Sequence, residues 1–199
     1  MNLLSGTSDF FSLDIGTTAI RLVQLRASAN NTKTLVKYAY VPVDSKIVAS
    51  DARADQQKLV QTVKELVTQA QLATHNVAVG LPAQKVFTTV VDVDRLPPNE
   101  LKTAIRYQAD ALIPTAIAES KIDFANLGDS PADKTKIEIL LSSVTNKFIE
   151  ERLDLLESIG LNVIAFEPDS MALTRALIAP GSAAPQMVLD VGNRNTDLV

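Results

Sequence analysis

The sequence has no cysteine and no tryptophan, and His75 is its only histidine. Lack of cysteine excludes disulfides, thiolate metal sites and thiol nucleophiles. A single histidine nearly excludes a histidine-based metal cluster or a Ser-His triad. A net charge of −4 gives no strong basic field, so we expect no nucleic-acid partner. No apolar run approaches the roughly 18 residues that a membrane-spanning helix needs.

One short segment near the start combines two chemistries. Residues 10–25 read FFSLDIGTTAIRLVQL, in which Asp14, Gly16, Thr17 and Thr18 interrupt two apolar runs. The pattern is typical of a β-hairpin turn, where glycine adopts backbone angles that other residues avoid. The same turn would present backbone N–H groups and two hydroxyls to phosphate oxygens, and Asp14 could hold a hydrated Mg²⁺. One copy leaves both interpretations open.

The order of apolar patterns predicts a mixed α/β protein. Strands are expected at 19–26, 34–43, 76–82 and 85–93, and an apolar stripe after Asp55 predicts an amphipathic helix. A different unit begins at LPPNELKTAIRYQADALIP, whose prolines bracket a predicted helix. Two segments after it are expected to pair as antiparallel strands. We therefore expect a core layer over 1–83, an inserted α+β subdomain over 84–165 and a return to the core over 166–185.

A second copy of the polar turn follows near residue 190. VLDVGNRNT aligns with SLDIGTTAI at Asp-x-Gly, and Asp190, Gly192, Asn193 and Thr196 carry its polar groups. Two such turns, each after a strand and separated by an α/β layer, are far more specific than one. They predict a duplicated fold in which two hairpins hold phosphate from opposite sides, the second hairpin lying within 186–199.

At this point the chain resembles the actin/Hsp70/sugar-kinase superfamily. LPPNELKTAIRYQADALIP, ESKIDFANL and NKFIEERLDLLESIGLNVIAFEPDSMALTRAL are in addition similar to the family of the type IV pilus assembly protein PilM, relatives of the division protein FtsA. The resemblance implies an actin-like (RNase H-like) mixed sheet with an inserted small α+β (1C-like) subdomain. It implies that the second lobe is absent or only begun at Val199, as in a fragment that binds ATP poorly alone.

The resemblance also assigns roles to residues. It implies that ATP and Mg²⁺ are bound, that Arg21 touches the phosphates and that Glu167 orders water near the terminal phosphate. It gives Asp14 and Asp190 to the metal ion and implies no catalytic residue, as in a scaffold with weak or no ATPase activity. The complete set of residues expected to bind the cofactor is Asp14, Gly16, Thr17, Thr18, Arg21, Glu167, Asp190, Gly192, Asn193 and Thr196.

By the same resemblance, the protein would be a cytoplasmic scaffold at the inner membrane, reaching the membrane only through partners. Its partners would be the N-terminal tail of PilN and other proteins of the pilus platform and motor. Extended peptides commonly bind at sheet edges and apolar pockets. Residues expected to contact the tail are Tyr38, Tyr40, Val86, Phe87, Arg95, Leu96, Ile105 and Tyr107.

Two alternatives remain open. A sugar-kinase-like phosphotransferase would need an aspartate base, for which Asp92 and Asp94 are candidates. An actin-like cytoplasmic domain of a type II secretion protein, or of an FtsA-like cell-division protein, would share the fold and differ in its partners.

Overall fold

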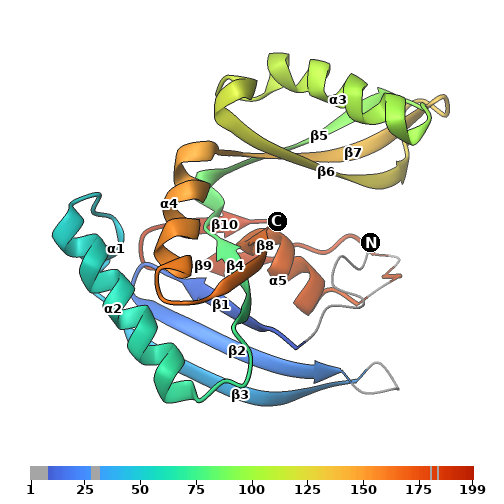
Figure 1. Ribbon diagram of the computed structural model, residues 1–199. Coiled ribbons are helices and arrows are strands. Elements are labelled where there is room, and N and C mark those ends of the chain that lie inside the picture. Colours follow the sequence, from blue (N-terminus) through green and yellow to red (C-terminus); the bar gives the residue numbers. More distant parts are fainter. Residues whose placement is uncertain (1–8, 28–31, 180, 183) are drawn as a thin grey trace. The chain divides into compact units, whose positions relative to one another are not determined.

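The computed structural model describes residues 9–27, 32–179, 181–182 and 184–199. It divides the chain into two compact units (Figure 1). The first contains the described part of residues 1–83 together with Leu153–Val199, and the second is Gln84–Arg152. None of the helices in these described ranges is long and apolar enough to cross a lipid bilayer.

The first unit is built on a five-stranded mixed sheet. Its strands are β1 (Phe11–Ile15), β2 (Ala19–Ala27), β3 (Lys33–Pro42), β4 (Asn76–Leu81) and β8 (Asn162–Pro168), in the order β3-β2-β1-β4-β8. β1, β4 and β8 run parallel, whereas β2 and β3 are antiparallel to their neighbours. The carboxyl ends of β1, β4 and β8 therefore meet at one edge, which is where open α/β sheets bind ligands.

Alternation along the strands places the core on one face of this sheet. Phe11, Leu13 and Ile15 of β1 are buried, and their neighbours are not. The long helix α2 (Arg53–Ala70) packs an apolar stripe against this face, as the period of its sequence predicts. The unit also contains α1 (Ser45–Val48), α5 (Asp169–Leu177) and the hairpin of β9 (Leu189–Val191) and β10 (Thr196–Leu198).

The second unit has a separate core. β5 (Val86–Asp94), β7 (Lys136–Thr145) and β6 (Ser120–Asp129) form an antiparallel sheet, and α3 (Pro98–Leu112) lies along one face of it (Figure 1). Pro98 occupies the first turn of α3, where its missing N–H costs nothing. Short 3₁₀ turns, η1 (Ala83–Lys85) and η2 (Ile117–Glu119), precede β5 and β6.

The end of the insert differs from the expected position. The second unit ends at Arg152, inside α4 (Asn146–Glu157), whereas the sequence suggested residue 165. Leu155, Leu156 and Leu161 explain the difference, because their buried side chains belong to the core of the first unit. An amphipathic helix followed by a strand gives no sign in the sequence of where one core ends and the next begins.

Candidate functional site

The first polar turn joins β1 to β2 at the carboxyl end of β1. Ile15 pairs with Ile20, and the Gly16 N–H donates to the Ala19 carbonyl at 3.1 Å. A Cβ on Gly16 would lie 3.0 Å from that carbonyl oxygen, which is tighter than most side-chain contacts. The turn therefore favours glycine for lack of space and not for its backbone angles, because the φ of Gly16 is not positive. Thr17 and Thr18 follow it at the tip.

The second polar turn, between β9 and β10, repeats this geometry. Val191 pairs with Thr196, and the Gly192 N–H donates to the Asn195 carbonyl at 2.9 Å. A Cβ on Gly192 would lie 3.1 Å from the same oxygen. Gly16 and Gly192 thus occupy equivalent positions, and Asp14 and Asp190 stand two residues before them.

The residue opposite each aspartate differs between the two hairpins. Arg21 faces Asp14 in the first, and its Nη1 donates to Asp14 Oδ2 at 3.1 Å. Asp197 faces Asp190 in the second, where it accepts a hydrogen bond from the Asn195 amide. Like charges at opposing positions of a ladder are unfavourable, so this pair does not stabilise the second hairpin as Asp14 and Arg21 can stabilise the first. Sequence reasoning assigned no role to Asp197, although the alignment of the two turns places it at the position of Arg21.

The segment from Val43 to Ser45, the first residue of α1, contacts both turns. The Val43 N–H donates to the Thr18 carbonyl at 3.0 Å, and Arg194 Nη2 donates to Ser45 Oγ at 3.3 Å. Burial raises the pKa of Asp14, Arg21 opposes this effect, and the charge of Asp190 adds to the increase. The two turns are therefore close enough in this unit for their carboxylates to interact.

Asp169 is a site residue that sequence reasoning missed. It begins α5 directly after β8, and its carboxylate packs so closely on β4 that a Cβ on Gly80 would collide with it. Burial, followed by the charges of Asp14, Asp190, Asp197 and Glu167, raises the pKa of Asp169 to about 7. Only the parallel pairing of β4 with β8 brings Gly80 beneath this side chain, and no local motif indicates it.

Glu167 is engaged by a neighbour. It lies near the end of β8, and its Oε2 accepts from Arg175 Nη1 of α5 at 2.7 Å. This hydrogen bond raises the pKa of Arg175. A role for Glu167 near phosphate would therefore require it to share or leave Arg175.

The carboxylates near the two turns suit a cation that keeps most of its own water. Within the described ranges, no group of three or more His, Cys, Asp or Glu side chains is arranged to hold a metal ion. Mg²⁺ in nucleotide sites needs less, because one or two carboxylates and the phosphates complete its shell. Asp14 and Asp190 stand at equivalent positions before the two turns, and the charge of Asp190 contributes to the raised pKa of Asp14.

The residues expected to contact a partner peptide lie in varied environments. Tyr38 and Tyr40 are exposed on β3 of the first unit, and Tyr107 is exposed on α3 of the second. Ile105 is only 2% exposed and belongs to the core of the second unit, so it is not available to a peptide. Leu96 packs against the same core, and Arg95 pairs with Asp129 at 2.8 Å.

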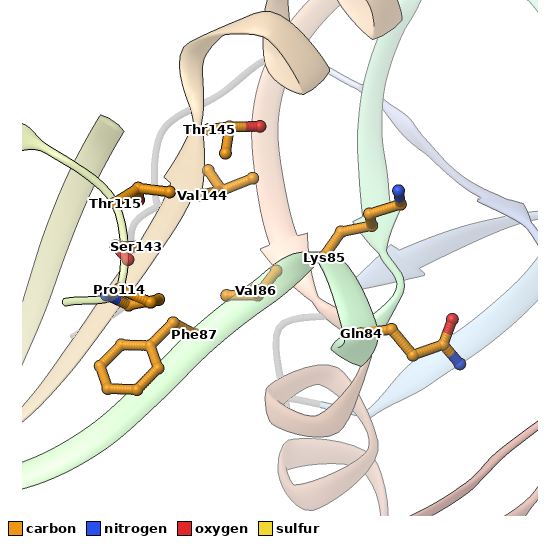
Figure 2. Close-up of a pocket in the computed structure, with 9 residues that line it drawn as sticks. All are labelled: Gln84, Lys85, Val86, Phe87, Pro114, Thr115, Ser143, Val144 and Thr145. Atoms are coloured by element: carbon orange, nitrogen blue, oxygen red, sulfur yellow. The ribbon is translucent and has the colours of Figure 1, made fainter. Parts of the chain in front are cut away.

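Val86 and Phe87 line a pocket within the second unit. Its volume is about 310 Å³, and Figure 2 shows Phe87 and Pro114 at one end and Gln84 and Lys85 at the other. The remaining lining residues are Thr115, Ser143, Val144 and Thr145. Beside the pocket, Lys85 Nζ lies 5.6 Å from the centre of the Phe148 ring. The pocket offers an apolar wall, several hydroxyl groups and one cation.

Comparison with known proteins connects this arrangement to a family. A family model described as type IV pilus assembly protein PilM matches residues 12–199. The fold is similar to that of a structure described as a PilM-PilN type IV pilus biogenesis complex, with a TM-score of 0.83 and 24% identity. That likeness covers 96% of this chain and 57% of the other, so the chain spans little more than half of that relative's length.

A second solved structure is more distant. It is the cytoplasmic domain of EpsL, an inner-membrane component of the type II secretion system of Vibrio cholerae, with a TM-score of 0.51 and 16% identity. The likeness covers 92% of this chain and 62% of that one. The mixed α/β sheet is that of the actin/RNase H-like fold, and the expected fold class is confirmed. Since the family model covers the chain from β1 to its last residue, the chain belongs to the family of the type IV pilus assembly protein PilM.

Proposed function

We propose that this chain is the phosphate-binding part of a cytoplasmic, actin-like scaffold of the type IV pilus, and that its two Asp-x-Gly turns grip the phosphates of ATP. One observation carries the proposal. Two turns with the same hydrogen-bonded geometry, 176 positions apart at Gly16 and Gly192, are both contacted by the segment from Val43 to Ser45. Such turns point backbone N–H groups outward and attract anions.

Some groups around the turns would bind the phosphate, and others would bind the metal ion. The Thr17, Thr18 and Asn193 segments supply N–H groups and polar side chains, and Arg21 supplies positive charge. Asp14 and Asp190 would hold Mg²⁺, which neutralises phosphate charge when bound. No residue is assigned to catalysis, because a nucleotide can shift a conformational equilibrium by differential affinity alone.

Binding of Mg²⁺–pyrophosphate measured by calorimetry tests this part of the proposal. Gly16→Val and Gly192→Val should each weaken it about tenfold, because each displaces charge-assisted N–H contacts. Thr88→Val, on an exposed strand position of the second unit, is the matched control and should bind normally. Unchanged affinity in both glycine variants, with circular dichroism showing intact folding, would refute the assignment.

We further propose that the N-terminal tail of PilN binds this chain through the pocket that contains Val86 and Phe87. Two observations support it: the similar structure is described as a PilM-PilN complex, and the pocket has an apolar wall suited to a peptide side chain. Fluorescence anisotropy with a labelled tail peptide should reveal about tenfold weaker binding for Phe87→Ala. Leu127→Ala, an exposed apolar position on β6, serves as the control. Equal losses in the two variants would argue against the pocket.

A further inference from the structure

The Arg21 side chain lies against the first turn itself. Its Nη1 is 3.1 Å from Asp14 Oδ2 and would be 3.2 Å from a Cβ on Gly16. The guanidinium therefore lies beside the face of the turn that Gly16 leaves without a side chain. With its side chain 54% exposed, Arg21 can turn without disturbing packed neighbours.

The second turn has no such arrangement. Asp197 stands at the position equivalent to Arg21, and Arg194 of that turn donates to Ser45 instead. The Asp14 carboxylate is half-buried and close to Asp190, so it gains from a neutralising partner. Arg21 neutralises the Asp14 carboxylate through their ion pair. An internal ion pair thus sits on one turn and not on its duplicate.

We infer that Asp14 is an internal competitor for Arg21, and that phosphate binds by taking Arg21 away from Asp14. The inference rests on the proposed phosphate role of the two turns. In the structure Arg21 is paired with Asp14. When an anion binds, the guanidinium exchanges the Asp14 carboxylate, which accepts a hydrogen bond from its Nη1, for phosphate oxygens, which can accept two parallel N–H bonds from it. The exchange leaves Asp14 free for a cation, so anion and cation binding assist each other.

A double-mutant cycle on the affinity for pyrophosphate in EDTA tests the exchange. Asp14→Asn should tighten metal-free binding about fivefold, because it removes both the repulsion and the competitor. In the Arg21→Gln background the same substitution should tighten binding less than about twofold, since only repulsion remains to be removed. The difference between the two factors measures the competition.

Asp190→Asn is the matched control. It removes a carboxylate from the other turn, where no arginine is bound to it, so its effect should be the same with Arg21 or with Gln at position 21. Equal effects of Asp14→Asn in the two backgrounds would overturn the exchange while leaving the phosphate site intact. If the unaltered chain binds no pyrophosphate even with Mg²⁺, the proposed function itself fails, and the inference fails with it.

A second readout follows the arginine directly. The ¹⁵N-resolved Nε–H signal of Arg21 should shift when pyrophosphate is added to the unaltered chain. In Asp14→Asn it should begin at a solvent-like position and move to the same bound position. If the Arg21 Nε–H chemical shift of the unaltered chain does not change at saturating pyrophosphate, the exchange is contradicted.

Discussion

At the scale of single residues, the ionised carboxylate of Asp169 is expected to destabilise the folded chain. Its ordinary pKa of 3.8 rises to about 7 because the carboxylate is partly buried and faces other acids. Between these two values the folded chain binds the proton more tightly than the unfolded chain does. Stability contributed by this group is therefore greatest below about pH 4, falls as the pH rises and is fully lost above about pH 7.

Asp169→Asn should accordingly stabilise the chain at pH 8 and have little effect on it near pH 4. The neutral amide keeps the shape of the side chain and removes the repulsion. Thermal melting followed by circular dichroism from pH 4 to pH 8 measures the difference, with Asp154→Asn on the exposed side of α4 as the control. A gain that is larger at low pH than at high pH would contradict the argument.

At the scale of elements, the two hairpins have the same turn geometry, but their side chains differ in burial. The β1–β2 hairpin carries Phe11, Leu13, Ile20 and Leu22 in the core. The side chains of β9 and β10 are mostly exposed, and Val191 is 71% exposed. Equivalent backbone geometry at Gly16 and Gly192 therefore has unequal weight in folding, because burial supplies most of the stabilising free energy.

A methyl group at each glycine should expose this difference. Gly16→Ala presses a Cβ against the Ala19 carbonyl and should cost about 1 to 2 kcal/mol. Gly192→Ala makes the same close contact, yet the global free energy of unfolding should change by less than about 0.5 kcal/mol. Urea denaturation measures both. Equal losses would mean that β9–β10 unfolds together with the core.

The predictability of these elements from sequence follows the range of the interactions. The strands around both Asp-x-Gly turns, the helix α2 and the proline-bounded α3 are local patterns, and the structure has them where the sequence indicates. Asp169 over Gly80 and Glu167 with Arg175 depend on packing between elements. A sequence pattern gives the face of a helix, not the neighbour that covers it.

At the scale of the whole molecule, the residues that the structure describes form two hydrophobic cores. Leu59 is fully buried in the first unit and Ile139 in the second. Because each core has its own sheet, loss of packing in one should open that unit before the other. A single free energy of unfolding would then describe this chain poorly.

Leu59→Ala and Ile139→Ala form a matched pair for this test, each expected to cost about 2 to 5 kcal/mol. Hydrogen exchange read by mass spectrometry should show faster exchange in β1, β2 and β4 for the first variant. For the second it should show faster exchange in β5, β6 and β7. Loss of protection throughout the chain in either variant would mean that the two units unfold as one.

The connection between β3 and α1 has a mechanical consequence for the site. Val43 is joined to the first turn by a backbone hydrogen bond, whereas Ser45 reaches the second turn only through the long side chain of Arg194. The first attachment is rigid and the second is a flexible tether. If the two turns move apart, β9–β10 should therefore be displaced first. An anion that binds both turns at once would restrain that displacement.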